Sequence, residues 1–182
     1  MNQPPPVRAV ITGGPGAGKS TLLEAAAQAG FTIFPEVARA ILQAPGGMAL
    51  RAQRPAAFAR AMLDAQRATW EASATMDGPV LFDRGFADIV GFLRLEGLAV
   101  PPALDQICRT YRYSGPIFRA PPWAAIYAGD AERIQSWDEA VASDTAISKA
   151  WQSYGYRLVD LPLAPVAERL EFMRERLLRR EP

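Results

Sequence analysis

The stretch from Val7 to Thr21, VRAVITGGPGAGKST, limits the possible folds of this chain more than any other. Its apolar start is typical of a buried strand, and its glycine-rich centre leads into a segment that favours a helix. Gly13, Gly18, Lys19 and Ser20 match the spacing G-x-x-x-x-G-K-[ST]. In such a loop successive backbone N–H groups point inward, and glycine permits the positive φ angles that this requires. The stretch therefore predicts a strand, an anion-binding loop and a helix in direct succession.

The same motif predicts a site for a nucleotide and Mg²⁺. We expect Lys19 to reach the β- and γ-phosphates and the Ser20 hydroxyl to ligate Mg²⁺. The start of the helix adds unpaired N–H groups and the positive end of its dipole. A chance glycine-rich turn is the alternative, which the strand–turn–helix context makes improbable. The expected nucleotide-binding residues are Gly13, Gly14, Pro15, Gly16, Ala17, Gly18, Lys19, Ser20 and Thr21.

Composition excludes several other classes of site. The chain has 182 residues, which suits one domain over positions 1–182, with residues 1–6 as a disordered lead-in. It has no histidine, so Ser-His-Asp catalysis and histidine-ligated metals are excluded. Its single cysteine, Cys108, excludes an internal disulfide and fits a reducing cytoplasm. A net charge of +1 and the lack of an 18-residue apolar run argue against nucleic-acid binding and a membrane span.

Short apolar segments alternate with helical patterns along the whole chain, with Ser114–Pro122 expected to be a loop. This alternation predicts a P-loop NTPase with an α/β/α arrangement of three layers and a mainly parallel five-stranded sheet. The expected strands are Val7–Ile11, Phe31–Phe34, Pro79–Phe82, Trp123–Tyr127 and Tyr156–Asp160. The expected helices are Ser20–Ala29, Glu36–Gln43, Pro55–Ala74, Phe86–Leu95, Pro102–Tyr111, Trp137–Tyr154 and Pro165–Arg179.

Charged residues follow two of the expected strands, at the edge where parallel sheets bind ligands. Asp83 ends the third strand and is a candidate for the Mg²⁺ side, while Arg84 could reach a phosphate or an acceptor. The alternative for this pair is a helix N-cap in a tight turn. Glu36 follows the second strand and is the candidate on the acceptor side, with Arg39 on the same helical face. The alternative for Glu36 is a structural ion pair with Arg39.

A glycine-containing polar segment, AGDAERIQS, follows the expected fourth strand. A mobile lid there would bring Arg133 over the phosphates and exclude water, although a simple surface arginine is the alternative. Arg119 is a weaker candidate for the same role. Three tryptophans in this half of the chain are expected to pack or to belong to the lid, not to stack on bases: Trp123, Trp137 and Trp151.

Taken together, these stretches resemble the AAA_28-type P-loop proteins, a group of small kinase-like ATPases. The group includes the nicotinamide riboside kinase domain of NadR-like proteins and an animal branch of GTP- and lipid-binding regulators. The chain also resembles deoxynucleoside kinases in having an acidic residue after the second strand and an acidic-Arg pair after the third. The matching stretches, in order, are ITGGPGAGKST, PEVAR, VLFDRGFAD, PPWAAIYAGDAERIQSWDEA and YGYRLVDLP.

The resemblance implies a nucleoside-kinase-like core with a lid. By position, Glu36 would be the catalytic base or the ligand of the acceptor hydroxyl, and Asp83 the carboxylate on the magnesium side. Arg84 and Arg39 would hold the acceptor or a phosphate, and Arg133 would be the lid arginine. The lid of this chain departs from many nucleoside kinases, because it is short and has one arginine in place of a series.

The function that these features predict is transfer of the γ-phosphoryl group of Mg·ATP to a hydroxyl of a small nucleoside-like acceptor. ATP is favoured over GTP because the chain lacks an N-K-x-D motif, and its D-R-G-F stretch lacks D-x-x-G spacing. The alternative is a nucleotide-dependent switch with slow NTP hydrolysis that signals to a protein or lipid partner. No nucleic-acid partner is expected.

Overall fold

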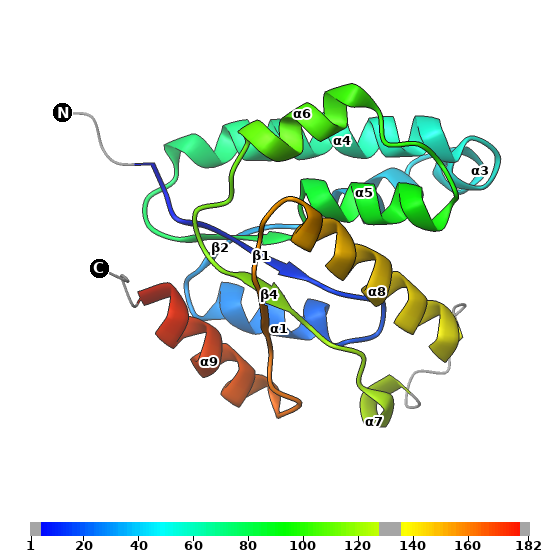
Figure 1. Cartoon of the computed structure of the whole chain (residues 1–182). Coiled ribbons are helices and arrows are strands. Elements are labelled where there is room, and N and C mark those ends of the chain that lie inside the picture. Colours follow the sequence, from blue (N-terminus) through cyan, green and yellow to red (C-terminus); the bar gives the residue numbers. More distant parts are fainter. Residues whose placement is uncertain (1–4, 128–135, 179–182) are drawn as a thin grey trace.

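The computed structural model describes residues 5–127 and 136–178 and contains a five-stranded sheet (Figure 1). The strand order is β2-β3-β1-β4-β5, and every neighbouring pair is parallel. The predicted parallel sheet is therefore confirmed, and the strand that precedes the glycine-rich loop lies at its centre. The strands are β1 (Arg8–Thr12), β2 (Thr32–Phe34), β3 (Val80–Asp83), β4 (Ile117–Arg119) and β5 (Leu158–Asp160).

Helices cover both faces of the sheet and form the outer two of three layers. Figure 1 shows α1 and α9 on one face, with α4, α5, α6 and α8 on the other. The first helices in the chain are α1 (Lys19–Gln28), α2 (Val37–Gln43), α3 (Gly47–Gln53) and α4 (Pro55–Ala72), followed by the short 3-10 turn η1 (Ser73–Thr75). The others are α5 (Phe86–Leu95), α6 (Pro102–Thr110), α7 (Ala124–Tyr127), α8 (Trp137–Ser153) and α9 (Val166–Leu178).

The central strand β1 separates two hydrophobic cores. Its side chains alternate between the faces of the sheet, as the period of a strand requires. Val10 packs in the core beneath α4, α5 and α8, whereas Ala9 and Ile11 pack in the core beneath α1 and α9. All three residues have no solvent exposure. The loop that follows β1 is therefore attached to a fully buried strand at the centre of the sheet.

The predicted fourth strand was wrong. Trp123 lies in a loop and the next four residues form helix α7. The actual fourth strand, β4, lies at Ile117–Arg119, inside the stretch that was expected to be a loop. Two consecutive prolines, Pro121 and Pro122, follow β4 and cannot donate hydrogen bonds to a neighbouring strand. With three residues, β4 is too short to show an alternating pattern, whereas the alanines of Trp123–Tyr127 favour a helix.

Helix α3 was not predicted from the sequence, because the consecutive glycines Gly46 and Gly47 are typical of a turn that ends a helix. Gly46 has φ 79° and Gly47 begins the new helix. A Cβ atom on Gly47 would lie 1.9 Å from the carbonyl oxygen of Ile41. The second glycine is thus required for α3 to pack closely on the end of α2.

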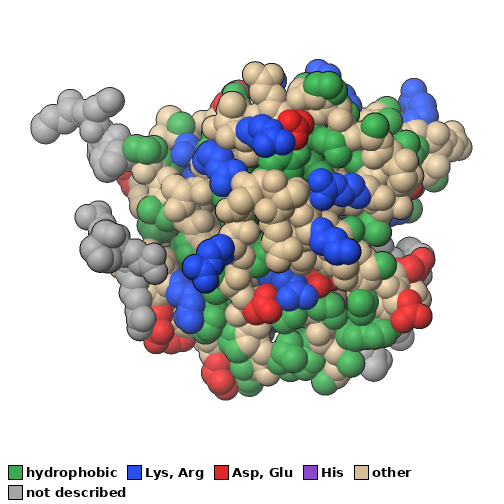
Figure 2. Space-filling view, in the orientation of Figure 1, with side chains coloured by type: hydrophobic (Ala, Val, Ile, Leu, Met, Phe, Trp, Pro, Cys, Tyr) green, Lys and Arg blue, Asp and Glu red, His purple; other side chains and the backbone are tan. Residues whose placement is uncertain are grey.

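Charged side chains are dispersed over the face of the molecule shown in Figure 2, where lysines and arginines are separated by polar and apolar surface. This face has no continuous basic stripe of the kind that binds a nucleic-acid backbone. Within the two described ranges, no helix is both long enough and apolar enough to cross a bilayer.

Candidate active site

The glycine-rich loop connects Thr12 of β1 to Lys19 of α1 and is enclosed by neighbouring backbone. Gly13, Gly16 and Gly18 have φ angles of 128°, 72° and 72°, in the region that side chains disfavour. A Cβ atom on Gly13 would lie 2.3 Å from the carbonyl oxygen of Ala120, just after β4. On its other side the loop is equally close to α8, since a Cβ on Gly14 would lie 2.5 Å from the oxygen of Ala140. The glycines are needed both for the backbone angles and for these close approaches.

Lys19 is folded back onto the loop that precedes it. Its Nζ donates hydrogen bonds to the carbonyl oxygens of Gly13, at 3.1 Å, and Gly14, at 2.5 Å, and the residue is 7% exposed. Burial, together with the nearby charge of Arg84, lowers the pKa of Lys19 to about 7, against the opposing charge of Asp83. A bound polyphosphate would favour the charged ammonium at this position.

Asp83 places a buried carboxylate at the carboxyl end of β3, beside Ile11 of β1. The residue is 8% exposed, and its Oδ1 has no hydrogen-bond partner among the described residues. Burial raises the pKa of Asp83 to about 6; the charge of Arg84 opposes this shift and that of Glu36 adds to it. An unpartnered buried carboxylate oxygen is suited to a cation. Magnesium sites often use one or two carboxylates together with phosphates and water, so Asp83 with the Ser20 hydroxyl fits Mg²⁺.

Arg84 connects Glu36, which follows β2, to the glycine-rich loop. Its Nε donates to Oε1 of Glu36 at 2.7 Å, and its Nη1 donates to the oxygen of Gly13 at 3.0 Å and to Oδ1 of Asp88 at 3.1 Å. Burial alone would raise the pKa of Glu36, but the charges of Arg84 and Lys19 outweigh it and leave this pKa below its ordinary value. Glu36 is therefore an ionised carboxylate. The expected alternative, an ion pair with Arg39, is not the one formed.

Asp88 is a buried carboxylate at the site that was not predicted from the sequence, and it positions Arg84. It is 6% exposed and accepts hydrogen bonds from Thr12 Oγ1 (2.6 Å), Arg84 Nη1 (3.1 Å), Gly85 N (2.9 Å) and Trp151 Nε1 (3.0 Å). It thus ties the end of β1, the start of α5 and helix α8 to the guanidinium of Arg84. An acidic residue in the first turn of a helix was visible in the sequence, but its distant partners were not.

A cavity of about 430 Å³ lies between α1 and α2 and brings several predicted site residues together. Arg39 lies at this cavity, with Nη2 3.5 Å from Oγ of Ser20. The cavity joins the end of the glycine-rich loop to the carboxylates that follow β2 and β3. Its polar lining residues are Ser20, Glu24, Glu36, Arg39, Gln43 and Asp83, and its apolar ones are Leu23, Ala27, Ile33, Pro35 and Ala40.

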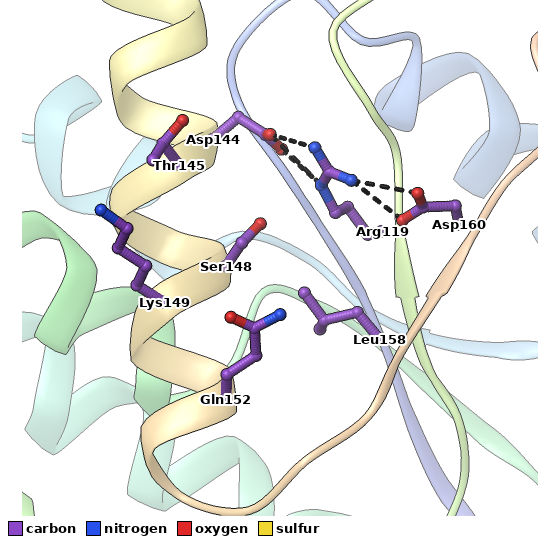
Figure 3. A pocket seen from close by; sticks show the side chains of 8 residues that line it. All are labelled: Arg119, Asp144, Thr145, Ser148, Lys149, Gln152, Leu158 and Asp160. Atoms are coloured by element: carbon purple, nitrogen blue, oxygen red, sulfur yellow. Dashed lines mark hydrogen bonds and ion pairs between the residues drawn. The ribbon is translucent and has the colours of Figure 1, made fainter.

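Arg119 lies apart from this cluster and is already neutralised. Figure 3 shows its guanidinium between Asp144 of α8, at 2.6 Å, and Asp160 of β5, at 3.0 Å. These residues line a second cavity, of about 420 Å³, between α8 and β5. The two carboxylates hold Arg119 at this second cavity, and Arg119 does not line the cavity shared by Ser20, Glu36 and Asp83. The stronger lid candidate, Arg133, lies outside the described residues.

The tryptophans that were expected to pack or to belong to the lid occupy different environments. Trp151 is fully buried in the core and donates to Asp88. Trp137 is 36% exposed, and its ring lies 5.2 Å from that of Tyr127. Trp123 is half-buried before α7.

Comparison with known proteins decides the family. The model of the AAA_28 family, an AAA domain, matches residues 8–169. The chain belongs to the AAA_28 family. No curated protein sequence matches this AAA_28 chain.

Solved structures share the fold of this AAA_28 chain. Deoxyadenosine kinase from M. mycoides with the products dCMP and a flexible dCDP is 16% identical, with a TM-score of 0.69, over 93% of this chain and 98% of that one. The same kinase with bound dATP is 15% identical, with a TM-score of 0.65 and the same coverage. NadR in complex with NR is 15% identical, with a TM-score of 0.61, over 94% of this chain and 52% of that one. These similarities establish a nucleoside-kinase-like fold.

Proposed function

We propose that this chain is a Mg²⁺- and ATP-dependent kinase that phosphorylates a hydroxyl of a small nucleoside-like acceptor. The observation that most supports this is the cavity shared by Ser20, Asp83 and Glu36, because it connects the nucleotide loop to an ionised carboxylate. A phosphoryl acceptor must lie between such groups for in-line transfer. The names of the similar structures, a deoxyadenosine kinase and NadR with NR, support an acceptor of the nucleoside class.

On the nucleotide side, the loop from Gly13 to Thr21 would cradle the phosphates of ATP with its backbone N–H groups. Lys19 would exchange its bonds to the loop carbonyls for bonds to the β- and γ-phosphates. The Ser20 hydroxyl and the Asp83 carboxylate would hold Mg²⁺, which supplies charge neutralisation at the β- and γ-phosphoryl oxygens.

On the acceptor side, Glu36 would accept the hydrogen bond of the acceptor hydroxyl and orient its oxygen toward the γ-phosphorus. A lowered pKa makes Glu36 a weak base. In the loose transition state of phosphoryl transfer, however, orientation of the acceptor hydroxyl matters more than the strength of the base. Arg84 lies between Glu36 and the oxygen of Gly13, so its guanidinium would stabilise charge on the transferring phosphoryl group. Arg39 would hold the acceptor, and Arg133 would close over the phosphates.

A second function, a nucleotide-dependent switch with slow hydrolysis, is favoured by one observation. The Glu36 carboxylate is already held by Arg84 at 2.7 Å, as a purely structural ion pair would be. In that case Glu36 and Arg39 would shape the fold, and the partner would be a protein or a lipid.

Steady-state ADP release from Mg·ATP separates the two functions. We expect a large stimulation by one member of a nucleoside panel that includes deoxyadenosine and nicotinamide riboside. A slow release that no acceptor changes, with tight nucleotide binding, would favour the switch.

A further inference from the structure

Arg169, in the first turns of α9, reaches the glycine-rich loop from the side opposite to Arg84. It is 2% exposed, and its Nη2 donates a hydrogen bond to the carbonyl oxygen of Ala17 at 3.2 Å. A Cβ atom built on Gly18 would lie 2.8 Å from its Nη1. The guanidinium therefore contacts the last part of the loop, where α1 begins.

The charge of Arg169 has no counterion in the described part of the chain. No carboxylate there lies within ion-pair distance of it, and its buried Nε has no hydrogen-bond partner. Its nearest aromatic contact is loose, with the Trp123 ring 6.0 Å away. Arg84 and Arg119, by contrast, each contact two carboxylates. Burial of an unpaired charge is strongly unfavourable unless a ligand or partner compensates it, so such a residue calls for an explanation.

Arg8, another buried arginine, provides a comparison. Arg8 is 9% exposed, donates to the Ser73 hydroxyl at 2.7 Å and stacks on Trp70 at 4.4 Å. It lies at the opposite end of β1 from the loop. Arg169 has a weaker aromatic contact, an unpartnered Nε and a position at the nucleotide loop.

Besides Arg84, which is paired with Glu36 and Asp88, three sources of positive charge lie at this loop. The first turn of α1 contains no acidic residue, so the positive end of its dipole is uncompensated there. The Lys19 side chain is buried against the loop carbonyls, and Arg169 adds a third positive group from α9. The phosphate chain of a nucleotide is an anion that can neutralise all three.

We propose that Arg169 is a further phosphate-binding residue of the nucleotide site, which adds positive charge to the phosphate chain from the α9 side of the loop. This inference rests on the proposed nucleotide site but not on the identity of the acceptor. The competing role is a structural one, in which Arg169 only attaches α9 to the Ala17 carbonyl.

The test compares Arg169→Met, Arg169→Lys and, as a matched control on the exposed face of α9, Arg174→Met. Calorimetry measures the dissociation constants of Mg·ATP, ADP and inorganic tripolyphosphate, and thermal unfolding is followed without nucleotide. We expect Arg169→Met to raise the dissociation constants of Mg·ATP and tripolyphosphate at least tenfold. Its Tm without nucleotide should be unchanged or higher, because an uncompensated buried charge has been removed. Arg169→Lys should bind with intermediate affinity, and Arg174→Met like the wild type.

Three results would overturn the inference. Unchanged affinity in Arg169→Met would show that the residue does not contact the phosphates. A lowered Tm in Arg169→Met, together with an Arg169→Lys variant that binds Mg·ATP no more tightly than Arg169→Met, would establish the structural role. Loss of ATP affinity with normal tripolyphosphate binding would place Arg169 at the base or the ribose. If wild-type protein transfers phosphate but Arg169→Met binds normally, this inference alone fails; if wild-type protein binds no nucleotide, the proposed function fails with it.

Discussion

Arg84 and Glu36 are 48 positions apart, and the Nε of the arginine donates to Oε1 of the glutamate at 2.7 Å. They meet because β2 and β3 are parallel neighbours, with Phe34 in register with Phe82 just before them. The backbone of Arg84 has a φ angle of 71°. This left-handed conformation costs a non-glycine residue about 1 kcal/mol or more in free energy. The strained conformation is maintained by the three acceptors that surround the guanidinium.

Replacing Arg84 with lysine should reduce phosphoryl transfer far more than nucleotide binding. A lysine ammonium cannot contact Glu36, the Gly13 oxygen and Asp88 in the same planar geometry. We expect kcat to fall by roughly 10²- to 10³-fold, as for loss of a donor at a developing charge, with the affinity for Mg·ATP within a few-fold of wild type. Arg60→Lys, at an exposed pair with Asp64, is the control. A kcat close to wild type in Arg84→Lys would remove Arg84 from the transfer step.

Asp88→Asn should destabilise the whole protein, because one oxygen of a fully hydrogen-bonded buried carboxylate becomes an NH₂ group facing donors. We expect a loss of about 2 to 4 kcal/mol in the free energy of unfolding, measured with urea. Asp64→Asn, at an exposed ion pair, should cost less than about 1 kcal/mol. Equal stabilities of the two variants would contradict the central structural role of Asp88.

The stability of the nucleotide-free protein should depend on the ionisation of Asp83. Its pKa is raised to about 6 in the folded state, so the protonated form is favoured by folding. This contribution is complete below the unfolded pKa near 4 and is lost as the pH rises through about 6. Asp83→Asn, which cannot ionise, should therefore be more stable than wild type at pH 7.5 by roughly 2 to 3 kcal/mol, with the difference vanishing near pH 4. Urea unfolding across this pH range measures it, and a less stable variant at pH 7.5 would refute the prediction.

Asp83→Asn should also lose the dependence of nucleotide binding on Mg²⁺. The carboxylate is the charged ligand that we assign to the metal, and an amide is a poor substitute for it. Titrations of ATP with and without Mg²⁺ should give dissociation constants that differ greatly for the wild type and only slightly for the variant. An unaltered Mg²⁺ effect would place the metal elsewhere.

Nucleotide binding should take up a proton at Lys19 under alkaline conditions. Burial lowers the pKa of Lys19 to about 7, so at pH 8 the free lysine is mostly neutral, while a bound phosphate chain favours its ammonium form. Calorimetry in two buffers of different ionisation enthalpy should reveal uptake of up to one proton at pH 8, where Asp83 is already ionised and contributes no proton exchange. Identical apparent enthalpies in both buffers at pH 8 would contradict the shifted pKa.

Much of the architecture could be predicted from local patterns, because a loop motif and alternating apolar segments define a parallel sheet. The short strand β4 could not, since three residues cannot display a period and its buried position is decided by β1 and β5. Asp83, Arg84 and Glu36 were identified from their places after strands, where side chains converge. The choice of Arg84 as the partner of Glu36, in place of Arg39, depended on tertiary packing.

The two candidate residues that were not predicted, Asp88 and Arg169, differ in how much local signal the sequence carries for them. Asp88 depends on Thr12 and Trp151, which are 76 and 63 positions away, and no local pattern links them. Arg169 carries a local signal in the sequence, because it lies on the apolar stripe of the last helix, one turn after Val166 and one turn before Met173. A basic residue on a buried helical stripe is a reason to look for an anion.

The central claim is that a hydroxyl facing Glu36 receives the γ-phosphoryl group, and transfer of label from γ-labelled Mg·ATP to a panel of nucleosides tests it most directly. Wild-type protein is predicted to label one nucleoside in amounts equal to the ADP formed. Glu36→Gln should bind ATP normally but transfer at least 100-fold more slowly, by the usual cost of losing such an orienting group, and Glu71→Gln, an exposed control, should behave as wild type. Label found only in inorganic phosphate, at a rate that no nucleoside changes, would contradict the claim.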